Sequence, residues 1–303
     1  METTIDTRAA LQSRRGVLWI VLAAVLWGTV GIASNGLFRM TATDPLSIGF
    51  LRMVIAAPVL LGAGWALLGR RMFTVSRRDA GLILVIGATM AWYQVLFFAA
   101  IAQVGVAIAV LVTLCSAPVI VALLAGLLLR ERLTRRVVVA LLCALSGTAL
   151  LVGGGSSASG DPAQTFSGVL LALGSSLGFA LMTLCSRALA ARSHPVQPMA
   201  WGLTASALFL LPCVLTFGLT LSYPLQGWLL LLYLGIVPTA LAFVIFLIGM
   251  RYVNATSASI ITLLEPLTAT LLAALLFGER LGPLGIVGAL LLIGAIGLLA
   301  RRS

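Results

Sequence analysis

The chain has 303 residues, of which 61% are hydrophobic and 9% charged, and its formal net charge is +11. A soluble domain of this length cannot bury so much apolar surface, so the composition excludes a soluble protein. The basic residues are 19 arginines and no lysine, placed in short segments beside apolar runs. This distribution indicates membrane topology rather than nucleic-acid binding.

Apolar runs of roughly 20 residues follow one another along the chain, the length that crosses about 30 Å of hydrocarbon as an α-helix. Runs this long and continuous exclude barrel strands, which alternate over about 10 residues. The sequence therefore predicts an all-α polytopic membrane protein with ten transmembrane helices. The predicted spans are residues 16–37, 45–69, 80–101, 105–129, 136–154, 167–190, 198–219, 226–249, 255–277 and 282–300.

An internal repeat organises these spans. Residues 105–133 recur 148 positions later as residues 253–281. In an ungapped alignment 10 of the 29 positions are identical, among them a mid-span proline, Pro118 over Pro266, and a closing Glu-Arg-Leu. Leu and Ala coincide easily in apolar helices, whereas a proline and a charged exit at one fixed offset indicate a repeat.

The arginines predict the orientation. With the N-terminus in the cytoplasm, 16 of the 19 fall in inner segments, two fall in outer segments, and Arg52 lies within a span. This bias predicts that both termini are cytoplasmic. Because each half has an odd number of spans, five, the second half is inverted relative to the first. Inverted repeats are typical of secondary transporters that work by alternating access.

The division between the halves is expected at residues 153–166, a Gly/Ser/Pro-rich stretch typical of a flexible linker. The expected organisation is a cytoplasmic tail, a first five-helix repeat, a periplasmic linker and a second, inverted five-helix repeat. These occupy residues 1–15, 16–154, 155–166 and 167–300.

Several motifs resemble the drug/metabolite transporter superfamily, in its EamA-type ten-helix branch. They are Trp27-Gly28, Phe50-Leu51-Arg52, and the endings of spans four and nine, of which Leu264-Glu265-Pro266 is the most specific part. The first half departs from the pattern, with Ala117 opposite the glutamate and Arg130 at the exit glycine. The resemblance implies export or exchange of small metabolites, often amino acids including aromatic ones. It also implies a central cavity lined mainly by spans one, three, four, six, eight and nine.

Pro118, Pro238 and Pro266 lie well inside the fourth, eighth and ninth predicted spans. Each lacks an amide hydrogen and frees the carbonyl four residues earlier. In lipid a freed carbonyl is tolerated where it faces protein or a water-filled cavity. The prolines are therefore interpreted as hinges or gates, with a static kink that improves packing as the alternative.

Arg52 and Glu265 are charged side chains away from the ends of predicted spans. A buried unpaired charge costs at least about 2.5 to 3.5 kcal/mol, so each needs a partner or water. At about 1.5 Å per residue their depths in the membrane differ by about 5 Å, and the two are predicted to pair directly or through water. Glu265 has three candidate roles: holding a substrate ammonium, carrying a coupling proton, or joining helices.

Deeper aromatic and polar residues complete the candidate site. Ring surfaces suit an apolar or aromatic side chain, and hydroxyl and amide groups suit a zwitterion. For each single member, packing or lipid contact is the alternative explanation. The predicted substrate-binding residues are Trp27, Trp92, Tyr93, Gln94, Phe97, Thr113, Ser116, Phe179, Thr239, Phe243, Ser257, Thr262 and Glu265.

The sequence thus predicts a secondary transporter that moves small neutral metabolites, amino acids foremost, out across a bacterial inner membrane. The expected partners are a small-molecule substrate and the lipid bilayer, with no nucleic acid, and the oligomeric state stays open. No cofactor, metal site or catalytic residue is predicted, because the spans lack a His or a pair of Asp. A multidrug exporter of lipophilic cations and a channel remain the alternatives.

Overall fold

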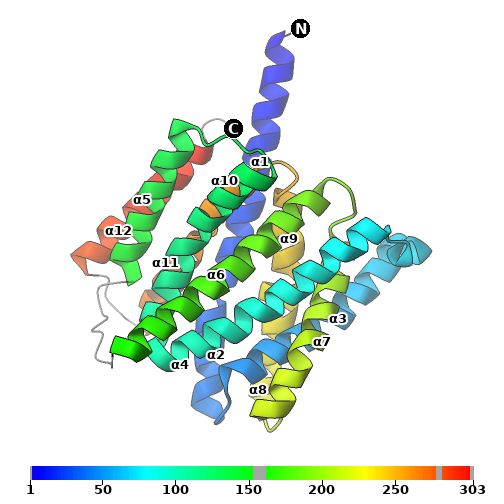
Figure 1. Cartoon of the computed structure of the whole chain (residues 1–303), viewed down its shortest axis with the longest axis vertical. Helices are drawn as coiled ribbons and strands as arrows, with labels where there is room; N and C mark the ends of the chain where they lie inside the picture. Colours follow the sequence, from blue (N-terminus) through cyan, green and yellow to red (C-terminus); the bar gives the residue numbers. More distant parts are fainter. Residues whose placement is uncertain (1, 153–161, 278–281, 301–303) are drawn as a thin grey trace.

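The computed structural model describes residues 2–152, 162–277 and 282–300, with side chains from Gln12 onward. In these ranges the chain consists of helices joined by turns and loops, without strands, which confirms the all-α prediction (Figure 1). The first repeat contains α1 (Glu2–Gly28), α2 (Val30–Met40), α3 (Pro45–Leu68), the 3-10 helix η1 (Gly69–Phe73), α4 (Arg77–Leu128) and α5 (Arg135–Val152). The second contains α6 (Pro162–Ala190), α7 (Val196–Phe217), α8 (Leu225–Gly235), the π-helix η3 (Ile236–Leu241), α9 (Ala242–Gly249), α10 (Ala255–Ile261), α11 (Leu264–Phe277) and α12 (Pro283–Ala300).

The number of spans follows from the long helix α4. Nine helical segments in the described ranges are long and apolar enough to cross a membrane. One of them, α4, has 52 residues, about twice the length that a bilayer requires. It is interrupted at Gly105, whose φ of 77° and ψ of 165° are not helical. Two spans therefore meet at this glycine, and the ten predicted spans are confirmed.

The two repeats pack reciprocally. Helix α3 of the first repeat lies against α7 of the second, and α5 lies against α12. The first span, α1, packs on α9 and α11, while its counterpart α6 packs on α4. This cross-pairing is what a two-fold relation between inverted repeats produces. The fold is thus an all-α membrane fold of two inverted five-helix repeats.

Glycines allow α5 and α12 to touch through their backbones. A Cβ added at Gly147 would lie 2.7 Å from the carbonyl oxygen of Gly288, and one at Gly288 would lie 2.5 Å from the carbonyl oxygen of Gly147. Small residues let helices approach this closely in membranes. This pair packs at the edge of the molecule, away from the centre (Figure 1).

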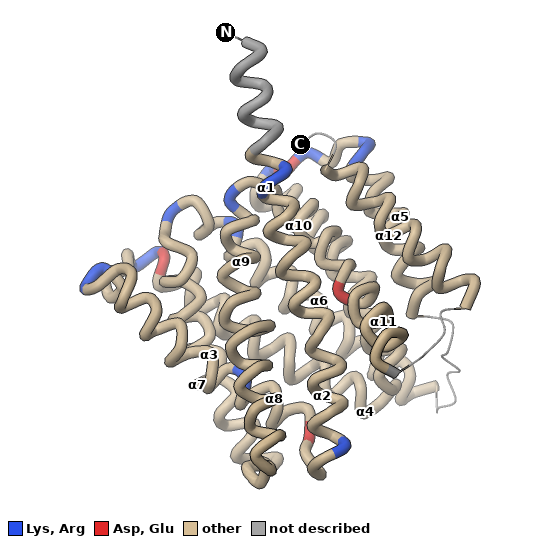
Figure 2. Tube along the Cα trace, turned by 180° about the vertical axis from the view of Figure 1, so that it is seen from behind, with Lys and Arg blue, Asp and Glu red and all other residues tan. Residues whose placement is uncertain are grey.

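Both termini lie at the same end of the molecule (Figure 1), which we name the terminal end. The opposite end is the distal end. Figure 2 shows the basic residues gathered toward the terminal end. An even number of spans places both termini on one side of a membrane, so the chain course and the arginine distribution agree.

Two boundaries differ from the predicted ones. Helix α1 begins at Glu2, so the tail at residues 1–15 continues the first span; residues 2–15 contain no Gly or Pro to stop a helix. Helix α6 begins at Pro162, inside the predicted linker 155–166, with proline in the first turn where its missing N–H costs nothing. Residues 155–161 lie outside the described residues.

Three spans are interrupted near mid-depth. The first breaks at Thr29, whose Oγ1 donates a hydrogen bond to the carbonyl of Leu26 at 2.7 Å. The eighth consists of α8, η3 and α9, and the ninth consists of α10 and α11 with Thr262 and Leu263 between them. Interrupted helices are tolerated where their free backbone groups face protein or a water-filled cavity. These breaks therefore mark where a site is expected.

Candidate functional site

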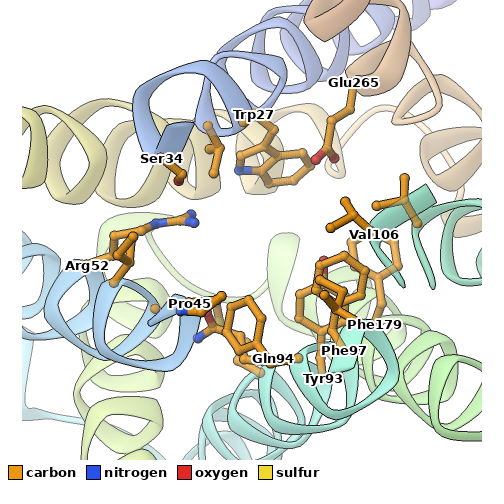
Figure 3. Close-up of a pocket in the computed structure, with 18 of the residues that line it drawn as sticks. Trp27, Ser34, Pro45, Arg52, Tyr93, Gln94, Phe97, Val106, Phe179 and Glu265 are labelled. Carbon is orange, nitrogen blue, oxygen red and sulfur yellow. The ribbon is translucent and has the colours of Figure 1, made fainter. Parts of the chain in front are cut away.

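A cavity of about 510 Å³ lies between the two repeats at these breaks. Side chains of α1, α2, α3, α4, α6, α9 and α11 line it (Figure 3). Pockets for small ligands occupy about 300 to 1,000 Å³, so a small metabolite fits. The sequence-predicted residues that line the cavity are Trp27, Arg52, Tyr93, Gln94, Phe97, Phe179, Phe243 and Glu265.

The cavity extends from mid-depth to the distal end. Its lining includes Phe38 near the end of α2, Pro45 at the start of α3, and Val106 directly after Gly105. All three neighbour distal-end turns. The lining contains no residue from the described turns at the terminal end. Access to the cavity is therefore from the distal end.

Aromatic rings form two of its walls. On one side Tyr93 stacks on Phe97, with ring centroids 5.9 Å apart and an interplanar angle of 9°, and Phe179 lies 6.1 Å from Tyr93. On the other side Trp27 packs against Phe243 at 5.0 Å and Phe246 at 5.3 Å. These distances are typical of favourable aromatic pairs. The rings present apolar faces to whatever occupies the cavity.

Arg52 enters the cavity from α3. Its Nε donates a hydrogen bond to Oγ1 of Thr239 at 3.0 Å, and that hydroxyl donates to the carbonyl of Leu234 at 2.7 Å. The carbonyl of Leu234 is free because Pro238, four residues later, has no N–H. Arg52 is thus linked through Thr239 to the carbonyl of Leu234, which Pro238 leaves without its usual backbone donor.

Glu265 enters from the opposite side, in the first turn of α11. The positive end of a helix dipole favours a carboxylate at this position. Figure 3 shows Arg52 and Glu265 facing the same space from opposite sides. No ion pair joins them in the described part of the chain, where Arg192 and Asp79 do form one at 3.1 Å. A direct contact, one form of the predicted pairing, is therefore absent from this conformation.

Two buried donors lie beside the cavity. Both side chains are only 6% exposed, yet the indole Nε1 of Trp27 and the amide Nε2 of Gln94 have no hydrogen-bond partner among the described residues. A buried donor without an acceptor costs about 1 to 3 kcal/mol. Oε1 of Gln94 lies so close to α3 that a Cβ at Gly49 would be 2.5 Å away. Glycine at this position makes room for the amide next to Arg52.

Five predicted residues lie away from the cavity. Trp92 is exposed and donates to the carbonyl of Gly174 at 3.1 Å. Thr113 and Ser116 face α6, where Thr113 donates to the carbonyl of Ala172 and Ser116 contacts Ser176 at 2.7 Å. Ser257 and Thr262 are buried and do not line the cavity. Thr239 also lies outside the lining and reaches it through Arg52.

The prolines related by the repeat have different surroundings. Pro118 lies inside α4, whose helix continues through it. Pro266 follows a break in the ninth span, where the carbonyl of Thr262 accepts a hydrogen bond from the amide of Glu265 at 2.9 Å. The proline effect is therefore visible in the backbone of the second repeat and not of the first.

Ser34 and Asn35 line the cavity from α2 and were not among the predicted site residues. They are adjacent polar residues in the first predicted span, and this pair was the available signal. Apart from Arg52, the α3 residues of the lining, including Gly49 and Met53, were also not predicted. The second span thus contributes more to the cavity than the predicted spans suggested.

A carboxylate closes the terminal end. Glu131, in the turn after α4, accepts hydrogen bonds from the backbone amide of Ala255 at 2.8 Å and from the amide and hydroxyl of Thr256 at 3.2 and 2.9 Å. These are the first residues of α10. The exit of the fourth span is thus bound to the start of the ninth, across the two repeats.

Among the described residues no group of three or more His, Cys, Asp or Glu could hold a metal ion. A family model matches the chain twice, over residues 14–153 and 166–301, and its description is EamA-like transporter family. The chain belongs to the EamA-like transporter family. It is therefore a multi-pass membrane transporter, and the resemblance to the drug/metabolite transporter superfamily is confirmed.

Relatives of this EamA-like transporter come from bacteria and archaea. It is 33% identical over 280 residues to the "Uncharacterized transporter YwfM" of Bacillus subtilis, covering 92% of each chain. It is 32% identical to an "Uncharacterized transporter" of Archaeoglobus fulgidus, covering 96% of this chain and 97% of that one. A "Probable terminal-alkyne amino-acid exporter" of Streptantibioticus cattleyicolor is 26% identical, with 95% and 94% covered. One solved crystal structure shares the fold, with a TM-score of 0.82 at 24% identity over 93% of this chain and 94% of the other.

Proposed function

We propose that this transporter exports small neutral metabolites, chiefly amino acids including aromatic ones, across a bacterial inner membrane by alternating access. The terminal end is cytoplasmic in this proposal, which the positive-inside rule supports. The distal end is then periplasmic, and the predicted linker between the two repeats is proposed to be periplasmic as well. The cavity, approached from the distal end, represents the outward-open state.

One observation carries the proposal: a single arginine and a single glutamate face each other across a cavity with aromatic walls. Each is a charge in a low-dielectric region without a direct partner, which is costly. A zwitterion supplies an anionic group to Arg52 and a cationic group to Glu265, so that both charges are compensated at once. The rings of Tyr93, Phe97 and Phe179 suit an apolar or aromatic side chain.

The alternative is export of lipophilic cations, which Glu265 and the aromatic rings also favour. A monovalent cation bound to Glu265 leaves Arg52 uncompensated beside it, and this disfavours the alternative. The printed name of the Streptantibioticus relative, an amino-acid exporter, supports the zwitterion proposal. A channel is disfavoured because inverted repeats with one closed end suit alternating access.

Counterflow in proteoliposomes tests the proposal. Vesicles loaded with unlabelled phenylalanine or leucine are expected to accumulate the labelled amino acid transiently, and vesicles loaded with a quaternary ammonium compound are not. A channel gives no such transient accumulation, because it has no carrier step that couples the two fluxes. If vesicles instead accumulate only a labelled quaternary ammonium compound, when loaded with the same unlabelled compound, the result would support the cation exporter.

A further inference from the structure

We propose that Arg52 binds the carboxylate of the substrate and that Thr239 is the residue that positions its guanidinium to do so. This inference rests on the proposed amino-acid export. It keeps the orientation proposed above, with the carboxylate on the α3 and η3 side and the ammonium on the Glu265 side. It adds a residue outside the cavity that controls specificity.

The positioning contact is a two-step hydrogen-bond relay. Thr239 is completely buried, and its hydroxyl donates to the carbonyl of Leu234 at 2.7 Å. With its hydrogen engaged there, the same oxygen accepts from Nε of Arg52 at 3.0 Å. Both partners fix the direction of the hydroxyl. The relay exists because Pro238 cannot bond the carbonyl of Leu234, which is left open for a side chain.

The relay uses only one of the five N–H groups of Arg52. Holding the guanidinium at Nε leaves its outer fork, the two Nη atoms, directed into the cavity, as Figure 3 shows. A planar fork of parallel N–H groups matches a carboxylate in a bidentate pair. An arginine with a purely structural role would direct this fork at protein acceptors, and no protein acceptor for it is present in the described part of the chain.

The neighbours of Arg52 are donors as well. Gln94 places its amide against Gly49, one turn before Arg52 on α3, and its Nε2 has no acceptor. The indole nitrogen of Trp27 also lacks an acceptor, and it lies on the Arg52 side of the ring (Figure 3). Both nitrogens are buried, so the outer fork of Arg52 is the donor group on this side that a carboxylate can reach directly.

The close approach of two backbones holds this arrangement in place. A Cβ added at Gly235 would lie 2.6 Å from Cγ2 of Ile55 and 3.3 Å from the carbonyl oxygen of Arg52. Helix α8 therefore touches α3 at the level of the arginine. The π-helix and the arginine are therefore in direct contact, and a change at position 239 acts on the guanidinium through the hydrogen bond to Nε.

The test compares three ligands that share a phenyl ring: phenylalanine, phenylethylamine without the carboxylate, and 3-phenylpropionate without the ammonium. Each competes with labelled phenylalanine in counterflow, and each is also tested for thermal stabilisation of the purified transporter. The variants are Thr239→Val, which is isosteric and lacks the relay, and Thr239→Ser, which keeps the hydroxyl. Arg52→Lys is a second disruptive variant, because it keeps the charge and loses the fork.

In Thr239→Val the half-inhibitory concentrations of phenylalanine and 3-phenylpropionate are expected to rise about tenfold, as the loss of a hydrogen bond to a charged group implies. The value for phenylethylamine is expected to stay unchanged, and Thr239→Ser is expected to match the parent protein. Arg52→Lys is expected to show the same selective pattern. These changes are expected in KM, with the maximal rate retained.

The two proposals fail in different ways. If the parent protein shows no amino-acid counterflow, the proposed function and this inference both fail. If it transports phenylalanine but Thr239→Val and Arg52→Lys weaken all three ligands equally, only this inference is overturned, and the relay is structural. An unchanged profile in both variants overturns it as well.

Discussion

The two copies of the repeated segment have opposite surroundings at their first residues. At the start of α10, Ala255 and Thr256 are 0% and 1% exposed, and Glu131 binds both. At the equivalent start, after Gly105 in α4, the aligned residues Ala107 and Ile108 are half-buried, and the preceding Val106 is 61% exposed and lines the cavity. One sequence unit therefore closes one end of the molecule and leaves the other open. The asymmetry lies in conformation and not in composition.

This difference identifies the contacts that hold the observed state. In an inverted-repeat transporter each repeat can adopt the arrangement of the other, and this exchange gives alternating access. Contacts found at only one end must then break during transport. Variants that remove such contacts, or strain the backbone that accompanies them, are expected to shift the population away from the observed state.

The largest effect is expected from Glu131→Ala, which leaves the amides of Ala255 and Thr256 without acceptors. Hydrogen bonds to a carboxylate contribute about 1.5 to 3 kcal/mol each, so the ratio of the state closed at the terminal end to the state open there should fall at least about tenfold. The measurement is maleimide labelling of Ser257→Cys, a position that is 6% exposed, with site-resolved mass spectrometry. Labelling should accelerate at least about tenfold relative to Ser257→Cys alone.

Glu131→Gln is the matched control, because the amide keeps one acceptor oxygen. It is expected to label at an intermediate rate. Equal labelling in all three proteins would show that the carboxylate does not hold the terminal end closed.

A smaller shift is expected from Gly105→Ala at the other copy. A φ of 77° with a ψ of 165° is almost restricted to glycine and costs other residues about 1 to 3 kcal/mol. No atom lies within 4 Å of a Cβ added there, so the cost is conformational and not a clash. The cavity open at the distal end should become less populated, and labelling of Phe38→Cys in its lining should slow by roughly tenfold.

Gly62→Ala provides the control for this variant, since Gly62 also has open space around it but lies in the regular helix α3. Its labelling rate at Phe38→Cys is expected to match the parent. A slowing as large as that of Gly105→Ala would contradict the role assigned to the left-handed conformation.

The fold was predictable because it depends on the order and spacing of residues along the chain. The length of apolar runs, the side on which arginines fall and the recurrence of residues 105–133 can all be read without knowing how helices rotate. Together these features predict the ten-span fold with two repeats. The break inside α4 was also readable, since the two spans predicted there meet at Gly105.

The site was less predictable because a helix in lipid can be apolar on every side. Arg52 and Glu265 stood out because charge is rare inside spans, and both line the cavity. In α4 the sequence favoured the hydroxyl groups of Thr113 and Ser116, whereas Val110 and Leu114, one turn apart, line the cavity. Which face of α4 lines the cavity depends on the rotation of the helix about its own axis, and tertiary packing sets that rotation. The hydroxyl groups face α6 instead.

The repeat-related prolines allow a third test. Pro266→Ala restores an amide that can bond the carbonyl of Thr262 and straighten the ninth span, since an interior proline costs a helix about 3 kcal/mol. Transport, measured as the initial rate of counterflow, is expected to slow several-fold. Pro118→Ala is expected to change the rate less, because α4 already continues through that residue. Equal slowing would mean that both prolines act as hinges despite their different backbones.

The smallest effect is expected where the two copies differ at their exits. The first repeat has Arg130 after its helix, in the left-handed region with a φ of 55°, where the second repeat has a glycine in the sequence. A non-glycine residue is strained there, and glycine is the usual residue at a helix end of this kind. Arg130→Gly is therefore expected to stabilise the protein by about 0.5 to 1 kcal/mol, measured as a rise in melting temperature in detergent.

Arg132→Gly removes the same charge at a residue outside the left-handed region, so it should lower the melting temperature slightly. A rise in both variants would point to charge, and not to backbone strain, as the cost that the first repeat carries.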